Sequence, residues 1–141
     1  MQILILNGPN LNLLGTRQPD IYGSATLREL ENRCRRWGES LGLSVSTSQS
    51  NHEGDLIDQL HNGIGRYAGV VLNPGALAHY SYALHDAIEA VPMPVVEVHI
   101  SDIANREERW RRTSVLAPAC AATISGKGID GYREALEYLA D

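Results

Sequence analysis

Residues 2–10 read QILILNGPN, and the fold that the sequence predicts follows from this stretch. Four isoleucine and leucine residues in a row, residues 3–6, are followed at once by Asn-Gly-Pro. A short apolar run that stops at turn-forming residues indicates a strand buried on both faces. Strands of this kind are typical of parallel sheets covered by helices. The first segment of the chain therefore predicts a central strand of an α/β protein.

Four further strand-like segments alternate with four helical segments along the rest of the chain. Thr26 and Glu29 form the pattern of a capping box at the start of the first helix. Residues 101–118 show neither the strand nor the helix spacing of apolar residues, and they are polar and rich in arginine. The alternation predicts an α/β fold in one domain over residues 1–141: a three-layer, doubly wound, five-stranded parallel sheet with flavodoxin-like strand order. The further strands are expected at 43–49, 70–72, 95–100 and 119–125, and the helices at 27–41, 56–64, 83–91 and 129–139.

The bulk composition narrows the class of protein. The formal net charge of −5 gives no electrostatic reason to expect a nucleic acid or an anionic membrane as partner. The sequence starts directly with its first apolar run, without a signal-peptide pattern, and no apolar run is long enough to span a bilayer. Cys34 and Cys120 lie far apart and are interpreted as reduced thiols. We therefore expect a cytoplasmic protein.

Polar side chains gather at the predicted carboxyl ends of the strands, where ligands bind in such folds. The loop after the first strand, residues 7–23, is longer than ordinary connections, and it carries Arg17 and Tyr22. This length favours a lid or binding loop. The other strands end in residues 50–53, in residues 73–75 with His79 soon after, and in residues 99–101.

Individually, these residues also have simpler interpretations. Asn73 beside a proline could only shape a turn, and His79 could be a surface residue. Glu97 and His99 interrupt an apolar strand on the same face. Because buried charges must be paired or serve a purpose, this favours a function over a structural ion pair. Lys127 is the only lysine, so an imine mechanism would depend on it alone. Dinucleotide, Walker A and metal-ligand patterns are absent, which leaves acid–base chemistry by tyrosine, histidine and arginine.

Several segments resemble the type II 3-dehydroquinate dehydratase family over essentially the whole chain. They are GPNLNLLGTRQPDIYG (8–23), QSNHEGDLID (49–58), NPGALAHYSYALHDA (73–87), VEVHIS (96–101) and GKGIDGYREAL (126–136). The resemblance implies a catalytic domain, a lyase that converts 3-dehydroquinate to 3-dehydroshikimate by anti elimination through an enolate. It implies no metal and no organic cofactor. The step belongs to the shikimate pathway of aromatic amino acid biosynthesis, and the sequence leaves open a role in quinate breakdown instead.

The resemblance also assigns catalytic roles. Tyr22 removes a proton alpha to the ketone, and Arg17 favours its phenolate, since a phenol with a reference pKa of about 10 is a poor base at neutral pH. Asn10 stabilises the enolate through an ordered water, and His99 protonates the departing hydroxyl. Glu97 supports a histidine.

Other residues are assigned to the substrate and the assembly. The implied substrate-binding set comprises Asn73, His79, the backbone of Ile100 and Ser101, and an arginine, with Arg106 as a second, lid-forming arginine. Asp86 is also assigned to substrate binding, as an acidic residue that one subunit supplies to the site of its neighbour in a homo-oligomer, a dodecamer built from trimers.

Four departures from the family pattern stand out. Gln18, Ala78 and His85 replace the usual Glu, Thr and Arg. In addition, NREERWRRTS (105–114) is one residue longer than the usual pattern, so either Trp110 or Arg111 falls at the substrate arginine. The spacing to Ser114 and Pro118 favours Arg111.

Two other functions fit the same pattern. A flavodoxin-like binding module without catalysis would give Arg17 and Tyr22 no role. A family member with altered preference would act on a related cyclic hydroxy acid.

Overall fold

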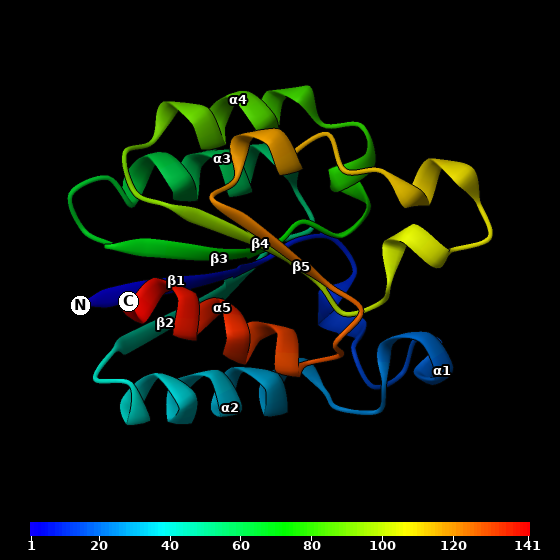
Figure 1. Cartoon of the computed structure of the whole chain (residues 1–141), viewed down its shortest axis with the longest axis horizontal. Coiled ribbons are helices and arrows are strands. Elements are labelled where there is room, and N and C mark those ends of the chain that lie inside the picture. Colours follow the sequence, from blue (N-terminus) through cyan, green and yellow to red (C-terminus); the bar gives the residue numbers. More distant parts are fainter.

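A computed structural model describes residues 1–141 and contains one parallel sheet of five strands between two layers of helices (Figure 1). The strand order is β2-β1-β3-β4-β5. This confirms the predicted three-layer α/β fold with flavodoxin-like order. The strands are β1 (Gln2–Asn7), β2 (Ser44–Gln49), β3 (Gly69–Asn73), β4 (Val95–His99) and β5 (Ala122–Ser125).

Two long helices cover each face of the sheet. Figure 1 shows α2 (Leu27–Ser40) and α5 (Asp130–Ala140) on one side, and α3 (Glu53–Asn62) and α4 (Tyr82–Ala90) on the other. The capping box is confirmed in part, because Thr26 Oγ1 accepts a hydrogen bond from the Glu29 amide at 3.2 Å. Helix α3 begins three residues before its first apolar position, because acidic residues in its first turn favour the helix N-terminus.

The loops contain short helical turns where the sequence has no clear period. The long first loop holds a 3₁₀ turn, η1 (Leu11–Leu13), and one turn of helix, α1 (Pro19–Tyr22). The segment 101–118, expected to be irregular, is organised by three 3₁₀ turns, and another follows β3. These turns are η2 (Gly75–His79), η3 (Ile103–Asn105), η4 (Arg109–Arg112) and η5 (Ala117–Ala119).

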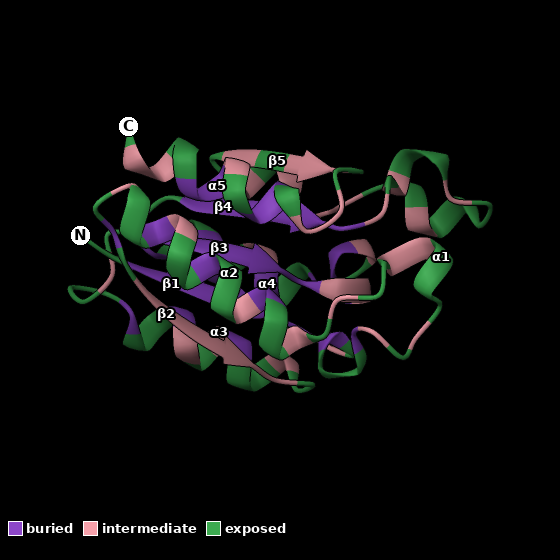
Figure 2. Cartoon of the chain, turned by 90° about the horizontal axis from the view of Figure 1, so that it is seen from below, coloured by how far each residue is buried: buried purple, intermediate pink, exposed green.

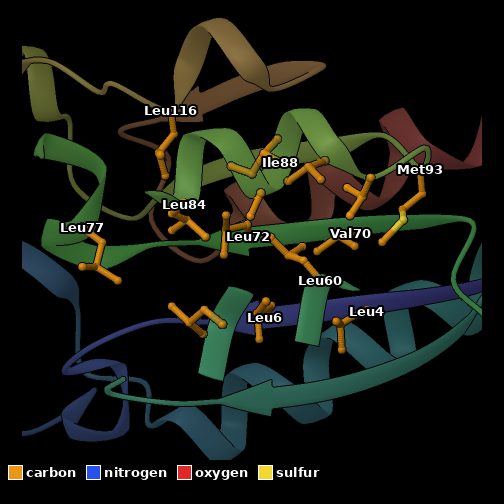
Figure 3. Close-up of a cluster of buried hydrophobic side chains, with 14 of the residues drawn as sticks. Leu4, Leu6, Leu60, Val70, Leu72, Leu77, Leu84, Ile88, Met93 and Leu116 are labelled. Carbon is orange, nitrogen blue, oxygen red and sulfur yellow. The ribbon is translucent and has the colours of Figure 1, made fainter. Parts of the chain in front are cut away.

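Strand alternation divides the core between the two faces of the sheet. Leu4, Leu6 and Leu72 pack with α3 and α4, a cluster that also includes Leu116 from the end of the arginine-rich segment (Figure 3). Ile5 and Val98 belong to the opposite cluster, which packs against α2 and α5. Figure 2 shows that the central strands are buried whereas the edge strands β2 and β5 are partly accessible.

The register of the sheet brings the strand ends together. Asn7 lies opposite both Gln49 and Asn73, and His99 lies opposite Ser125. Beyond this edge, α1 and the segment 101–118 extend past the sheet on the same side of the molecule (Figure 1). Carboxyl strand ends and two long loops thus surround a single region. No helix of the chain has the length and apolar character that crossing a membrane requires.

Candidate active site

A cavity lies at the carboxyl edge of the sheet, between the strand ends and the two long loops. We refer to residues 15–23 of the first loop as the lid loop. The cavity takes lining residues from the exits of β1, β3 and β4, from the lid loop and from the arginine-rich segment. They are Pro9, Asn10, Leu11, Leu14, Arg17, Tyr22, Asn73, Gly75, Ala76, His79, His99, Ile100, Ser101, Ile103, Arg106 and Arg111.

His99 and Glu97 form a buried pair at the end of β4. The two residues are separated by one position, so strand alternation places both side chains on the same face. The Nε2–H of His99 donates to Glu97 Oε2 at 2.5 Å. His99 is 5% exposed and Glu97 is fully buried. Because Nε2 faces the carboxylate, Nδ1 is the His99 nitrogen left for a ligand in the cavity.

His79 lies beside His99 and is held by the segment 113–116. Its Nδ1–H donates to the carbonyl oxygen of Thr113 at 2.8 Å, because a carbonyl can only accept. Its ring stacks near that of His99, with centroids 6.5 Å apart, and meets the edge of Trp110. Burial lowers the pKa of His79 below its usual value of 6.5, and the neighbouring His99 acts in the same direction. His79 is therefore neutral at neutral pH and presents Nε2 as an acceptor.

Tyr22 on the lid loop contacts two arginines. Arg17 lies over its ring, with the guanidinium carbon 4.6 Å from the centroid. Arg106 Nη1 donates to the Tyr22 hydroxyl oxygen at 3.2 Å and to Ser101 Oγ at the same distance. The sequence linked Tyr22 to Arg17 alone, whereas the direct hydrogen bond to its oxygen comes from Arg106.

Asn10 lines the cavity in a left-handed backbone conformation, with φ at 70°. Its backbone N–H donates to Asn51 Oδ1 at 3.0 Å, which ties the β1 exit to the β2 exit. Nearby, the two loops approach too closely for a side chain: a Cβ at Gly8 would lie 2.7 Å from the Pro74 carbonyl oxygen. The glycine thus allows the exits of β1 and β3 to pack together at the cavity floor.

Asn73 belongs to a buried polar network that crosses the sheet. Its Oδ1 accepts from the Gly75 amide at 3.1 Å, and its Nδ2 donates to the Tyr132 hydroxyl at 2.8 Å. The Tyr132 hydroxyl donates in turn to Asn7 Oδ1 at 2.6 Å. Burial raises the pKa of the Tyr132 phenol, so this hydroxyl stays protonated. Three elements, β1, β3 and α5, are thereby joined beneath the cavity.

The arginine-rich segment places Arg111 on the cavity wall, and Trp110 packs against His79 outside it. Arg111 Nε donates to Glu108 Oε1 at 2.8 Å, and its guanidinium carbon lies 4.1 Å from the centroid of the Trp110 ring. Of the two residues that the sequence left open as the substrate arginine's position, Arg111 lines the cavity and Trp110 does not.

Asp86 does not line this cavity. It lies exposed on α4, where His85 Nδ1 is 3.2 Å from its carboxylate. Glu89 completes a group of three possible metal ligands with these two residues, all within 4.8 Å on an accessible helix face. Glu97 also lies outside the cavity lining and reaches it only through His99.

The three substitutions relative to the family pattern have different surroundings. Gln18 is exposed, has φ at 40° and makes no capping hydrogen bond with its side chain. Ala78 is fully buried, and its carbonyl oxygen accepts from the Val115 amide at 2.7 Å. His85 faces the carboxylates of Asp86 and Glu89. None of the three lines the cavity.

Four residues with supporting contacts were not among the predicted site residues. Asn51 holds Asn10, Thr113 holds His79, Ser114 contacts Glu97, and Tyr132 holds Asn73. Asn51 lies in residues 50–53, which the sequence indicated as a strand end, although it was not assigned to the site. Tyr132 fitted the apolar stripe of the last helix, so the helical spacing of apolar residues gave no sign that its hydroxyl has polar partners.

Comparisons with known proteins agree with the resemblance drawn from the sequence. The family described as dehydroquinase class II matches residues 1–140. A 3-dehydroquinate dehydratase of Thermus thermophilus is 56% identical over 140 residues, covering 99% of this chain and 93% of its own length. One of Deinococcus radiodurans is 54% identical, covering 99% and 97%. A type II dehydroquinase structure from Butyrivibrio crossotus superposes with a TM-score of 0.97 at 42% identity, covering 100% of this chain and 98% of that one.

Proposed function

The chain belongs to the class II dehydroquinase family, and from this premise we propose that it dehydrates 3-dehydroquinate to 3-dehydroshikimate. Residues 1–141 would form one catalytic domain. The observation that carries the proposal is that a tyrosine held by two arginines and a histidine held by a buried carboxylate line the same cavity. A base and an acid at separate positions are what an elimination needs.

Proton removal is assigned to Tyr22. Its oxygen takes the proton from the carbon alpha to the ketone, and the electron pair moves into an enolate. Two cations support this step, because Arg106 donates to the oxygen at 3.2 Å and Arg17 lies over the ring, and both favour a negatively charged phenolate. The lid loop can open to admit the substrate and close to bring this base over it.

The enolate oxygen needs hydrogen-bond donors fixed in place before the charge develops. Asn10 is assigned to this role, through an ordered water. Its backbone is anchored by Asn51, so its side chain starts from a fixed position at the cavity edge.

Departure of the hydroxyl beta to the ketone is assigned to His99. The carbon–oxygen bond breaks as the enolate electrons form the new double bond, and a proton from His99 Nδ1 converts the hydroxyl to water. Glu97 supports this acid because an adjacent carboxylate stabilises an imidazolium and fixes the orientation of the ring. No metal or organic cofactor takes part in these steps.

The substrate carries a carboxylate and several hydroxyls, and the remaining lining residues fit these groups. Arg111 offers a planar donor pair of the kind that binds carboxylates. Neutral His79 offers an acceptor to a hydroxyl, and Asn73, Ile100 and Ser101 complete the wall.

We also propose that Asp86, exposed on α4, completes the site of a neighbouring subunit in a dodecamer built from trimers. Light scattering measures the mass of the assembly, and a folded, active monomer would contradict this proposal.

The dehydration itself is tested by adding 3-dehydroquinate to the purified protein and following the ultraviolet absorbance of the conjugated enone. The absorbance rises if the proposal is correct. A folded protein that produces no rise, at any pH between 6 and 9, would refute it. Comparing several related cyclic hydroxy acids in the same assay measures any altered preference.

A further inference from the structure

The segment Thr113–Leu116 holds both histidines of the cavity at once, and we call it the clasp. The carbonyl oxygen of its first residue, Thr113, accepts a hydrogen bond from the Nδ1–H of His79. Its third residue, Val115, donates its amide to the Ala78 carbonyl at 2.7 Å, directly before His79. Leu116, which is fully buried, anchors the clasp in the core on the α3 and α4 face of the sheet. The clasp does not line the cavity, but it is a fixed support for the histidines that do.

Ser114 extends the clasp to the other histidine. Its hydroxyl donates to Glu97 Oε2 at 2.6 Å, the same oxygen that accepts from His99 Nε2. The Leu116 amide donates to Ser114 Oγ at 3.1 Å. Because this amide occupies a lone pair of the hydroxyl oxygen, the hydroxyl hydrogen is directed at the carboxylate. The backbone of the clasp thus fixes both the position and the polarity of the Ser114 hydroxyl.

Glu97 needs these donors because it is fully buried. An ionised carboxylate without water is costly unless several donors satisfy it. Oε2 has two donors at 2.5 and 2.6 Å, and Oε1 has only the Thr123 hydroxyl at 3.5 Å. Ser114 is therefore the strongest partner of Glu97 apart from His99.

We propose that Ser114 is a positioning residue of the proposed dehydration site, which acts through Glu97 to keep His99 oriented with Nδ1 toward the substrate and able to give up its proton. The proposal rests on the proposed function. It extends that function by linking His99, the proposed acid, to the clasp, which also holds His79. Arg111 lies only three positions before Ser114 in the chain. A substrate carboxylate bound by Arg111 would therefore have a defined position relative to His99.

No other ionisable group near His99 and Glu97 takes the place of Ser114 as a partner of the Glu97 carboxylate. Burial, and then the negative charge of Glu97, raise the pKa of the Cys120 thiol to about 12, so it stays neutral. His79 is neutral because burial lowers its pKa. The remaining charged or ionisable side chains that line the cavity belong to the lid loop and the arginine-rich segment: Arg17, Tyr22, Arg106 and Arg111. These four residues line the cavity, whereas Ser114 contacts the Glu97 carboxylate directly.

The hydrogen bond has a defined effect on proton release from His99. Ser114 stabilises the Glu97 anion most when His99 is neutral, because an imidazolium then no longer compensates the charge. Without Ser114, the state with a neutral His99 is destabilised more than the state with a charged one. His99 would hold its proton to higher pH, and the coupled pair would shift part of that proton onto Glu97. Both changes make His99 a weaker acid toward the substrate.

The test compares Ser114→Ala with Ser114→Thr, which keeps the hydroxyl. For Ser114→Ala we expect kcat to fall about 10- to 100-fold, the equivalent of one hydrogen bond to a charged group. We expect KM to change less than threefold and the basic limb of the kcat profile to move to higher pH. In Ser114→Thr, the basic limb of the kcat profile should stay at its wild-type pH. Thr123→Val is the matched control, because it removes a hydroxyl from the same carboxylate at the longer distance and should leave both kcat and the limb unchanged.

Nitrogen NMR of the His99 ring provides a readout that does not require turnover. The His99 signal, assigned with a His99→Gln variant, should titrate with a midpoint at higher pH in Ser114→Ala than in wild type. Ser114→Cys, with similar volume and a weak donor, replaces Ser114→Ala if the latter does not fold. An unmoved midpoint with a lowered melting temperature alone would overturn the positioning role. A protein without enone formation, but with the shifted midpoint, would refute the proposed function and leave the link between Ser114 and His99 in place.

Discussion

The cavity has two sides that are held in opposite ways. We call Asn73, His79 and His99 the strand-end wall. Asn73 and His79 are bonded to distant parts of the chain, at Tyr132 and Thr113, and His99 is bonded to the buried Glu97 of its own strand. Asn73 and His99 are also at most 5% exposed. The lid loop, in contrast, makes its backbone hydrogen bonds only with residues 13–19, and one side-chain bond, from Arg106 to Tyr22, joins it to the arginine-rich segment.

This difference suggests a division of labour. Glycines with positive φ at both ends of the lid loop, Gly15 and Gly23, permit backbone rotation there. A wall that is fixed by long-range bonds can define where the substrate lies, and a loop with local bonds can move to deliver the base. If this is correct, changes in the lid loop should alter the rate with little effect on stability, whereas changes in the wall should alter both.

The largest effect is expected for Tyr22→Phe. Loss of the base should lower kcat by about 10²- to 10⁴-fold, the usual contribution of a general acid or base. The free energy of unfolding should change by less than about 0.5 kcal/mol, because the residue is only half-buried and bonded to one side chain. Enone formation and thermal melting measure the two quantities. Tyr80→Phe is the matched control, since its hydroxyl is exposed and outside the cavity, and full activity in Tyr22→Phe would remove Tyr22 from the mechanism.

Tyr132→Phe tests the strand-end wall and should be the next largest effect. The change removes the hydrogen-bond partner of Asn73 Nδ2 and of Asn7 Oδ1. The Asn7 side chain is then left without any hydrogen bond, because its Nδ2 is already unpaired. We expect a loss of about 1–3 kcal/mol in the free energy of unfolding, together with a raised KM as the Asn73 amide loses its orientation.

A matched control for this change lies on the same helix. Tyr138→Phe removes an exposed hydroxyl that contacts only the Ala121 carbonyl at 3.4 Å, and it should leave the denaturant midpoint unchanged. Equal midpoints for the two variants would mean that the buried network does not stabilise the wall.

The sequence predicted the framework of this site better than its connections. Apolar runs such as residues 3–6 and the helical period after Thr26 are local signals, so strands, helices and their order could be predicted from them. Asn73, His99 and Tyr22 were predicted as site residues because they lie at strand ends or in an unusually long loop. The resemblance to a known family then supplied their proposed roles.

The connections between these residues could not be predicted, for a physical reason. Arg106 meets Tyr22 across 84 positions, and Tyr132 meets Asn7 across 125. Such contacts depend on strand register and on the 3₁₀ turns between Ile103 and Ala119, a segment without periodicity. Ser114 served only to align that segment in the sequence, and its contact with Glu97 became visible only in the fold.

A smaller effect on the wall is expected from pH. The folded chain holds the pKa of His79 below 6.5, so the unfolded chain takes up a proton there first as the pH falls. The stability that His79 contributes is therefore complete above about pH 6.5 and is lost as the pH falls toward the lower folded value. His79→Asn, whose amide can still donate to Thr113, should show a flatter dependence of melting temperature on pH between 7.5 and 5. His61→Asn on the exposed face of α3 should follow wild type, and parallel curves for all three proteins would contradict the inference.

The smallest effect is expected for Gln18→Gly in the lid loop. Gln18 has φ at 40°, a conformation that costs a residue with a Cβ roughly 1 kcal/mol, and its side chain makes no cap bond that offsets this strain. Glycine removes the strain but gains freedom in the unfolded chain, so the free energy of unfolding should change by less than about 1 kcal/mol. Gln18→Ala keeps the Cβ and is the control, expected to be no more stable than Gln18→Gly.

The functional consequence of Gln18→Gly separates the two sides of the cavity most directly. A more flexible hinge before α1 should change kcat/KM a few-fold, because it alters how often Tyr22 lies over the substrate, while the His99 NMR signal stays at its wild-type position. A shift of that signal would show that strain at Gln18 reaches the strand-end wall, through the one bond between Arg106 and Tyr22. The lid loop would then be coupled to the wall, and the division of labour proposed above would not hold.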